Sequence, residues 1–200
     1  MSGVSDFVVS PVAPPDAPAL VALMKREGTP CFCRYWHFAG TNKEWEARVA
    51  TSPETNEREL VDALTLGGEE GRGLVARRAD PDSQEIVGWM KLAFRRALPK
   101  LTARVPYRAL DLDPSRVLSV GCILVDPAMR GRGVARALVR GAIEAAPKWG
   151  AQFLEAYPRR SDHRLHDGEV WTGPEHVFAE LGFETVRESP QYPVLRRALP

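Results

Sequence analysis

The feature that most constrains the fold is a strand, a helix and a second strand in the middle of the chain. Residues 116–125 form the longest apolar run of the sequence, and apolar residues recur at helical spacing after Pro127. These positions are Val134, Ala135, Leu138, Val139, Ala142, Ile143 and Ala146. Residues 151–157 are apolar again, so the order predicts one right-handed crossover that joins a parallel pair of strands.

The segments around this unit predict antiparallel strands and short helices. Strands are expected over residues 7–12, 73–78 and 85–94, the last two as a hairpin, and near residues 183–187 and 194–197. Helices are expected before Gly28, around residues 43–50, 53–66 and 174–181, and a polar connection over residues 95–114. Without repeats or linkers, the chain is predicted to be a single domain over residues 1–200, of mixed α/β (α+β) class.

Four local details carry further expectations. Pro11 favours an edge strand, because proline cannot donate to a sheet ladder. Ser52 is a candidate N-cap before Pro53 at the first helical position. Gly121 inside the long apolar strand suggests a bulge. Residues 31–42 have neither strand nor helix period and are expected to form a structured loop or a broken helix.

Composition excludes several classes of protein. Hydrophobic residues make up 44% of the chain, and 27 Lys and Arg against 26 Asp and Glu leave a net charge of +1. This balance excludes disorder and argues against nucleic acid as the main partner. Three cysteines are expected to stay free thiols in a reducing compartment. With neither a basic leader nor an apolar run of about 18 residues, the expectation is a cytoplasmic protein without a membrane partner.

The segment between Val125 and Ala135 is a candidate anion site, because it joins a buried strand to the start of a helix. Unpaired amides at a helix start point outward and the helix dipole favours negative charge. Gly131 and Gly133 remove side chains that would hold a pyrophosphate away from the backbone. The arginines between the glycines can add charge-assisted bonds to phosphate.

Three other interpretations of this loop were weighed. A nucleoside triphosphate loop needs Gly-Lys-Ser/Thr, which the segment lacks. A dinucleotide fingerprint needs a third glycine where this chain has Arg136, and its first glycine should follow the strand directly, although Glu155 stands where a ribose-binding acid would. A plain loop entering a helix stays open, but it gives no reason for two glycines.

The sequence from Arg130 to Ala135 resembles the Gln/Arg-x-x-Gly-x-Gly/Ala signature of the GNAT superfamily of acyl-CoA-dependent N-acetyltransferases. The Val-x-Pro step before it and the Gly182-Phe183 pair after the last helix are similar to the same family. The order of predicted elements also matches this family along nearly the whole chain. Three further stretches resemble a bacterial branch of unsettled substrate: residues 31–36, 87–89 and 155–158.

The resemblance implies a splayed mixed sheet flanked by helices, with acetyl-CoA as cosubstrate. The strand that ends at Val125 would part from the strand at residues 151–157 and admit the pantetheine arm. Backbone groups of Ile123, Leu124 and Val125 would pair with pantetheine, and an amide near Ile123 would polarise the acetyl carbonyl as an oxyanion hole. The pyrophosphate would be held by the amides of Arg130, Gly131, Arg132, Gly133, Val134 and Ala135.

The acid and base of the reaction depart from the family pattern. Where the family often has a tyrosine acid and a carboxylate base, this chain has Phe178 and Ser119. Tyr157 is the substitute acid, with a strand-edge tyrosine as the alternative. Glu155 shares its parity and is the candidate base, directly or through water, with a salt-bridged carboxylate as the alternative. Cys122 as a nucleophile is weighed against core packing, which is favoured.

No metal site is predicted. Cys31, Cys33 and His37 lack a strong zinc spacing, and so does the stretch over residues 162–167. Both stretches are expected to line or cover the substrate side. The aromatic residues Phe32, Tyr35, Trp36 and Phe38 are interpreted as core, with a cation–π seat for a substrate amine as the alternative.

The predicted function is transfer of an acetyl group from acetyl-CoA to an amine of a small molecule or an exposed peptide amine, by direct attack in a ternary complex. The alternative is a non-catalytic acyl-CoA-binding sensor or interaction module, which the missing tyrosine at position 178 favours. A homodimer joined through residues 194–197 and a monomer both stay open.

Overall fold

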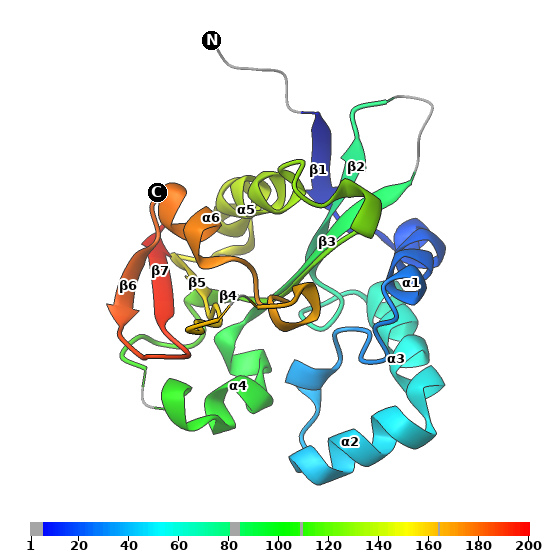
Figure 1. The fold of residues 1–200 in the computed structure, drawn as a ribbon, viewed down its shortest axis with the longest axis horizontal. Coiled ribbons are helices and arrows are strands. Elements are labelled where there is room, and N and C mark those ends of the chain that lie inside the picture. The colour runs from blue at the N-terminus through cyan, green and yellow to red at the C-terminus, as the bar shows by residue number, and fades with distance from the viewer. Residues whose placement is uncertain (1–5, 81–84, 109, 164) are drawn as a thin grey trace.

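A computed structural model of the protein describes residues 6–80, 85–108, 110–163 and 165–200. Seven strands form one sheet in the order β1-β2-β3-β4-β5-β7-β6 (Figure 1). The strands are β1 (Phe7–Pro11), β2 (Gly73–Arg78), β3 (Ile86–Phe94), β4 (Val117–Val125), β5 (Phe153–Ala156), β6 (Glu184–Arg187) and β7 (Val194–Ala198). The helices are α1 (Ala17–Arg26), α2 (Asn42–Thr51), α3 (Pro53–Leu66), α4 (Pro99–Ala103), α5 (Val134–Ala145) and α6 (Glu175–Glu180).

The sheet is mixed, as predicted. β4 and β5 pair in parallel, with α5 between them in the chain, whereas the other neighbouring strands pair antiparallel. The hairpin of β2 and β3 is therefore confirmed, although most of its predicted turn lies outside the described residues. β1 lies at one edge of the sheet, which agrees with the expectation from Pro11.

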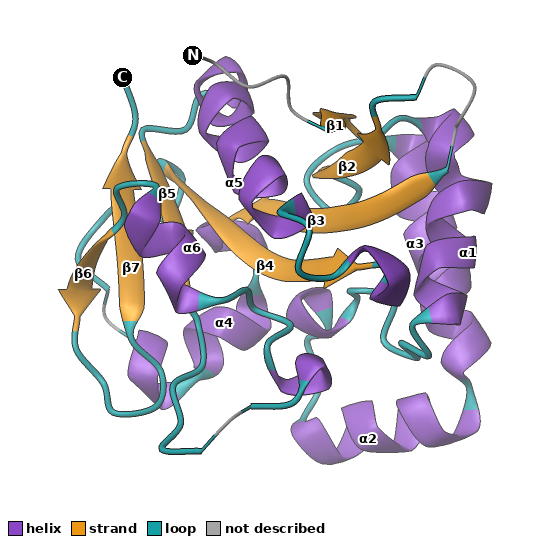
Figure 2. Ribbon diagram, turned by 45° about the horizontal axis from the view of Figure 1, so that its top comes forward, coloured by secondary structure: helices purple, strands orange, loops and turns teal. Residues whose placement is uncertain are grey.

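The central pair of strands separates along its length. β4 pairs with β5 only over Val117, Leu118 and Ser119, whereas its pairing with β3 continues to Val125. Figure 2 shows the two strands side by side at one end, with β4 then running away toward β3. Beyond Ser119, the backbone edge of β4 that faces β5 is therefore unpaired with it, as the resemblance implied. We call the region where the two strands separate the splay.

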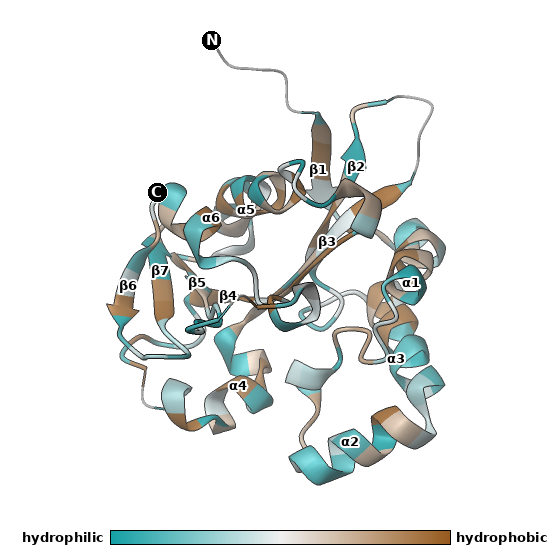
Figure 3. Ribbon diagram, in the orientation of Figure 1, coloured by the Kyte–Doolittle hydropathy of each residue, from teal (hydrophilic) through white to brown (hydrophobic). Residues whose placement is uncertain are grey.

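Helices cover both faces of the sheet. The apolar side of α5 packs with Leu118 and Val120 of β4 in the largest core cluster, and Figure 1 shows α5 and α6 along one side of the sheet. On the other face, α1 and α3 pack with Trp89, Cys122 and Leu124. Figure 3 shows β3 brown along most of its length, because most of its residues are apolar, and residues on both of its faces are buried.

A bulge at Gly121 changes the alternation of β4. Its pairing with β3 passes from Val120 opposite Leu92 to Cys122 opposite Lys91, so Gly121 is the extra residue. The bulge prediction is confirmed. Its consequence is visible in the core, where Val120 and Ile123 pack on the α5 face although three positions separate them.

Two local expectations differ from the structure. Helix α3 begins at Pro53 as predicted, but the Ser52 side chain makes no capping hydrogen bond, whereas Thr41 caps α2 through the amide of Glu44. The connection over residues 95–114 contains α4, whose five residues are too few for a helical period to appear in the sequence. Tertiary contacts stabilise α4, because Leu98 and Leu101 belong to a buried cluster.

Among the residues that the structure describes, none of the helices combines the length and hydropathy needed to cross a bilayer.

Candidate active site

The glycine-rich loop has the predicted geometry. After β4, the Asp126 carboxylate accepts the amide of Ala128 at 3.0 Å and fixes the turn that follows. Gly131 (φ 72°) and Gly133 (φ 88°) are left-handed, a conformation that other residues adopt at a cost. Helix α5 begins directly after Gly133, and its first backbone bond runs from the Ala137 amide to the Gly133 carbonyl. The amides of Arg130 and Arg132 make long bonds of 3.4 Å to the carbonyls of Pro127 and Met129, whereas the amides from Gly133 to Arg136 precede the helical ladder, as an anion site requires.

Ion pairs brace this loop against the other side of the sheet. Arg130 pairs with Glu27 just after α1, and Asp126 pairs with Arg26 at 2.9 Å. Arg132 is exposed and lines a hollow of about 510 Å³ together with Met129 and Arg78. The space around Gly131 and Gly133 is open, since a Cβ at either position would meet nothing within 4 Å. The loop therefore offers an anion room and the guanidinium of Arg132, although Asp6 and Asp80 also line the hollow.

The free edge of β4 presents one backbone donor to the splay. The Ile123 amide donates to the carbonyl oxygen of Trp171 at 2.7 Å, from the segment that leads to α6. This amide is the group expected to polarise an acetyl carbonyl. In this structure the Trp171 carbonyl oxygen lies where the acetyl carbonyl oxygen is expected. Its distance from the Ile123 amide nitrogen is typical of oxyanion-hole donors.

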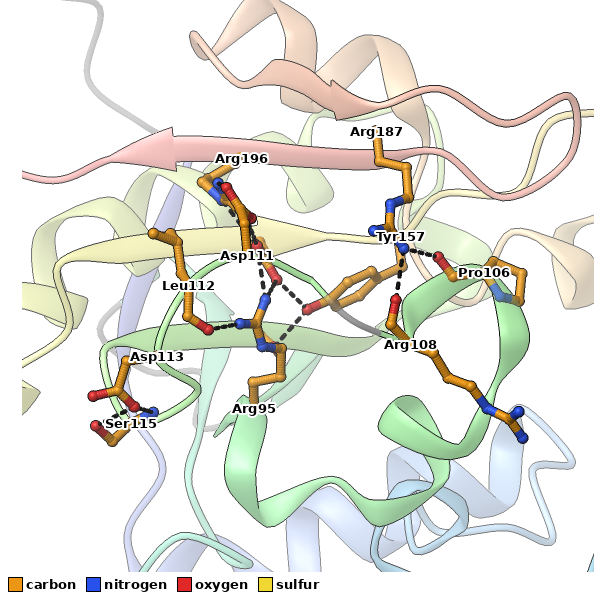
Figure 4. A network of polar contacts seen from close by, with 12 residues as sticks. Arg95, Pro106, Arg108, Asp111, Leu112, Asp113, Ser115, Tyr157, Arg187 and Arg196 are labelled. Atoms are coloured by element: carbon orange, nitrogen blue, oxygen red, sulfur yellow. Dashed lines mark hydrogen bonds and ion pairs between the residues drawn. The ribbon is translucent and has the colours of Figure 1, made fainter.

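The side chains of Glu155 and Tyr157 contact each other near Ser119, where the pairing of β4 with β5 ends. The Tyr157 hydroxyl donates to Glu155 Oε2 at 2.7 Å and lies 2.8 Å from the hydroxyl of Ser119, the last β4 residue paired with β5 (Figure 4). The predicted shared face of Glu155 and Tyr157 is therefore correct. Burial and the Glu155 carboxylate raise the pKa of Tyr157 well above its usual value.

Two arginines also bind the Glu155 carboxylate. Arg95 donates to both oxygens, at 3.2 and 3.0 Å, and Arg196 on β7 donates to Oε1 through two nitrogens, at 2.9 and 2.7 Å (Figure 4). Arg196 also bonds Asp111, and Arg95 bonds the carbonyl of Leu112. Glu155 itself is 0% exposed.

These contacts change the interpretation of Glu155. A buried carboxylate that already accepts bonds from two guanidinium groups and a phenol has no free lone pair for a substrate proton. The base role expected for Glu155 therefore does not follow from its geometry, and the alternative of a salt-bridged carboxylate describes it. The dinucleotide interpretation loses its ribose-binding acid for the same reason, because a ribose cannot reach a fully buried group.

The two residues that replace the family's usual acid and base are both buried. Phe178 on α6 is fully buried and packs edge-on against Phe183, with ring centroids 5.3 Å apart. Ser119 is fully buried beside Tyr157. Neither side chain offers a titrating group to the splay.

Cys33 and Cys122 belong to the core, whereas Cys31 and His37 are partly buried. The Trp89 indole donates to Cys33 Sγ at 3.3 Å, and a hydrogen bond to Cys33 together with burial raises the pKa of Cys122 well above its usual value. Cys122 is therefore a protonated core residue, which agrees with the packing alternative. Burial lowers the pKa of His37 to about 3. Within the described ranges, His, Cys, Asp and Glu side chains form no group of three that could hold a metal ion.

Aromatic side chains from distant segments gather beside the splay. Trp36 contacts Tyr35 and Trp171, with ring centroids 5.2 and 5.3 Å apart, and Tyr35 also contacts Trp45. Lys100 lies 5.7 Å from the ring of Tyr35. The predicted loop over residues 31–42 is thus an aromatic packing unit that carries a short turn, Tyr35–His37.

A second hollow, of about 640 Å³, lies between the end of β5 and the start of α6. Its lining includes Arg159, His163, Val170, Glu175 and His176. His163 comes from the polar stretch that was expected to cover the substrate side. Because Val170 precedes Trp171, this hollow adjoins the segment that contacts the Ile123 amide.

Three of these residues were not predicted from the sequence: Arg95, Trp171 and Arg196. Trp36 was expected in the core, where the structure places it, but its partners were not predicted. Arg196 stands opposite Glu155 in the β5–β7 register, so the strand alternation contained a signal for that pair. Arg95 follows a strand directly, but the fold of the connection after it was not evident. Trp171 lies in a loop, where no periodic pattern predicts its partner.

Together, the splayed mixed sheet, the left-handed glycines and the amide at the strand edge agree with the acyl-CoA-dependent transferase fold that the resemblance implied. The structure is similar to yncA from Salmonella typhimurium, solved with its cofactor acetyl-CoA, at 14% identity and TM-score 0.55, covering 98% of this chain and 95% of that one. It is similar to a GCN5-related N-acetyltransferase from Kribbella flavida, at 20% identity and TM-score 0.55, covering 97% and 98%. It is also similar to paia N-acetyltransferase from Thermoplasma acidophilum, solved with coenzyme A, at 13% identity and TM-score 0.53, covering 96% and 98%.

The sequence itself matches the model of the acetyltransferase (GNAT) family over residues 38–167, which is more than half of the chain. The chain therefore belongs to the acetyltransferase (GNAT) family. It is an acetyl-CoA-dependent N-acetyltransferase by class, with acetyl-CoA as cosubstrate, as the sequence predicted. No curated protein matches the sequence.

Proposed function

We propose that the protein transfers the acetyl group of acetyl-CoA to a primary amine, by direct attack while both substrates are bound. The observation that carries the proposal is the Ile123 amide, which points into the splay and donates to a carbonyl oxygen at 2.7 Å. We infer that the Trp171 carbonyl stands in for the acetyl carbonyl, which replaces it when acetyl-CoA binds. An amide fixed at this distance stabilises the oxyanion that forms during attack.

The rest of acetyl-CoA follows the elements around this amide. Pantetheine pairs with the free edge of β4 at Ile123, Leu124 and Val125, in the direction that β5 leaves open. The pyrophosphate lies on the amides of Arg130, Gly131, Arg132, Gly133, Val134 and Ala135. The open space around Gly131 and Gly133 supports this arrangement, because a side chain there would stand between phosphate and backbone.

In the reaction, the amine nitrogen attacks the carbonyl carbon, the carbon–sulfur bond breaks, and the thiolate takes up a proton while the amine loses one. Tyr157 is the candidate acid, because its hydroxyl lies where β4 and β5 part. The phenol is buried and donates its one proton to Glu155, so it must release that hydrogen bond to protonate the thiolate. Its raised pKa keeps the phenol protonated throughout the working pH range. In this proposal Glu155 orients the phenol and does not remove the substrate proton.

Tyr157→Phe tests the acid role. The substitution keeps the ring and removes the hydroxyl, so turnover is expected to fall about a hundredfold while the acetyl-CoA dissociation constant changes little. Because the pKa of Tyr157 lies well above 10, the wild-type rate should not decline through this group below pH 10. Steady-state kinetics between pH 6 and pH 10 measure both effects.

Tyr107→Phe is the matched control for this variant. Tyr107 is buried and its ring contacts that of Tyr157, with centroids 4.9 Å apart, so both variants lose one oxygen from one aromatic cluster. The control is expected to keep turnover within about threefold of wild type. Equal activity of Tyr157→Phe and wild type would contradict the acid role and leave a water molecule as the simplest proton source.

The acceptor in this proposal is a small-molecule amine or an exposed peptide amine. The hollow beyond β5 supports a small acceptor, because about 640 Å³ is within the range of small-molecule sites. His163 and His176 line it, and imidazole is the side chain that most often serves as a general base. The hollow therefore supplies candidate bases in place of Glu155.

A second function is favoured by one observation, the hydrogen bond that the Ile123 amide already makes to the Trp171 carbonyl. If acetyl-CoA does not displace this contact, the protein is an acyl-CoA sensor without turnover. Calorimetry with acetyl-CoA, followed by detection of free CoA against a panel of amines, separates the two functions. Binding with release of CoA supports the enzyme, binding without release on any amine supports the sensor, and absence of binding contradicts both.

Gly173→Ala tests whether the segment that carries Trp171 must move away from the Ile123 amide before acetyl-CoA binds. Gly173 is left-handed (φ 93°), and a Cβ there would lie 2.8 Å from the Phe178 ring and 2.9 Å from Ile123 Cδ1, so alanine weakens the seat of the segment. Acetyl-CoA affinity is therefore expected to rise about threefold to tenfold, measured by calorimetry. In Gly168→Ala, the control in the same loop, the Cβ meets nothing within 4 Å and affinity should stay unchanged. Weaker binding in Gly173→Ala alone would mean that the segment is part of the bound form.

A further inference from the structure

The side chain of Trp36 reaches the central strand from a segment 85 residues earlier in the chain. Its indole nitrogen donates to the carbonyl oxygen of Gly121 at 2.6 Å, in a buried position. Trp36 is 1% exposed. The contact therefore joins the aromatic unit of residues 31–42 to the bulge in β4.

The bulge explains why this carbonyl needs a partner. Val120 and Cys122 have partners on β3, whereas Gly121 is the extra residue of the bulge. A buried carbonyl without a donor is destabilising, and the Trp36 indole supplies the donor. The fit is close, because a Cβ on Gly121 would lie 2.9 Å from Cδ1 and 3.2 Å from Nε1 of Trp36.

The bulge also decides where the Ile123 amide points. In a strand, side chains and backbone donors alternate together, so a one-residue insertion reverses the direction of everything after it. Without the insertion, Ile123 would have the parity of Ser119, and its amide would face β3. With the insertion, the Ile123 side chain packs on the α5 face with Val120, and its amide faces the splay.

We propose that Trp36 is a positioning residue for acetyl transfer. Its indole N–H stabilises the bulge at Gly121 and so keeps the Ile123 amide directed at the acetyl carbonyl. The same ring contacts Trp171, with centroids 5.3 Å apart, and Trp171 carries the carbonyl that the acetyl group replaces. The inference rests on the proposed function, because it gives the bulge a role in the transfer step.

Trp36→Phe removes the indole N–H and keeps an aromatic ring. The expected result is a fall in kcat of about tenfold to a hundredfold, with the acetyl-CoA dissociation constant within threefold of wild type, because the pyrophosphate is held elsewhere. The matched control is Trp89→Phe. Trp89 is also fully buried, and its indole donates to Cys33 Sγ instead of to the bulge. The control is expected to keep kcat within threefold.

A spectroscopic readout follows the bulge directly. The chain has three isoleucines, Ile86, Ile123 and Ile143, so ¹⁵N-isoleucine labelling gives three backbone amide signals. Trp36→Phe should shift the Ile123 signal and leave that of Ile143, on α5, in place. Trp89→Phe should move the Ile123 signal less than Trp36→Phe does.

The outcomes separate the inference from the function on which it rests. A folded Trp36→Phe protein with wild-type kcat, or with an unmoved Ile123 signal, overturns the positioning role. Equal losses of kcat in Trp36→Phe and Trp89→Phe overturn it too, because general packing then explains the effect. If the wild type binds acetyl-CoA without turnover on any amine, the proposed function fails, while the Ile123 signal still reports whether Trp36 holds the bulge.

Discussion

Gly133→Asp is expected to abolish acetyl-CoA binding, with a dissociation constant at least about a hundredfold above that of the wild type. The new carboxylate stands at the start of α5, where the pyrophosphate would lie, so it repels the ligand and occupies its space. A hundredfold change corresponds to about 2.7 kcal/mol of binding free energy. Isothermal titration with acetyl-CoA measures it.

Strain is the competing explanation for this loss, and Gly150→Asp controls for it. Gly150 is also left-handed (φ 84°, against 88° for Gly133), and a Cβ at either glycine meets nothing within 4 Å. Both variants should therefore lose about 1–2 kcal/mol of folding stability, and only Gly133→Asp should lose binding. Wild-type affinity in Gly133→Asp would remove the pyrophosphate assignment, and loss in both variants would make strain the cause.

The arginines of the loop should matter less than its backbone. Arg130 is engaged with Glu27, and Arg132 is exposed on the edge of a hollow. Replacing both with alanine leaves the amides of the loop in place, so affinity is expected to fall less than in Gly133→Asp.

Glu155→Gln is expected to destabilise the fold by about 3 kcal/mol. The substitution keeps the size of the side chain and removes the charge, which leaves the buried guanidinium of Arg95 and that of Arg196 without their shared carboxylate. Breaking a buried ion pair by removing one partner costs about 3–5 kcal/mol, and the remaining contacts of Arg196 with Asp111 place the expected loss at the lower end. Urea unfolding followed by fluorescence measures the change.

Glu180→Gln is the control for this stability effect. Glu180 pairs with Arg136 between α6 and α5, and both side chains are largely exposed, so the same chemical change should cost less than about 1 kcal/mol. A loss below 1 kcal/mol in Glu155→Gln would contradict the structural role of Glu155. A stable Glu155→Gln protein with impaired turnover would instead return Glu155 to the catalytic residues.

The predictions for Glu155 and Tyr157 show what the alternation of side chains along a strand can and cannot predict. Strand parity placed both side chains on one face correctly, because the side chains of a strand alternate with a period of two. It could not determine which of them met solvent, since Arg95 and Arg196 come from segments 60 and 41 residues away. The acid role of Tyr157 stays a prediction, whereas the buried ion pairs of Glu155 became visible only in the fold.

The order of elements, the single crossover, the glycine-rich loop and the bulge were determined by the sequence itself. Each depends on residues close together in the chain: an apolar run, helical spacing, glycines with free backbones, and one glycine inside a strand. Such local signals also carried the resemblance to the acetyltransferase family, because the glycine-rich motif is contiguous between Val125 and Ala135.

The contacts between segments far apart in the sequence were decided only by the tertiary structure. Trp36 reaches the Gly121 carbonyl across 85 residues, and the Trp171 carbonyl meets the Ile123 amide from a loop after β5. No pattern in the chain specifies these pairs, because loop residues have no period and hydrogen bonds between them form only when the sheet and its helices have packed. The sequence therefore determined the glycine-rich loop that we propose as the cofactor site, and the packing of distant loops decided what contacts the Ile123 amide.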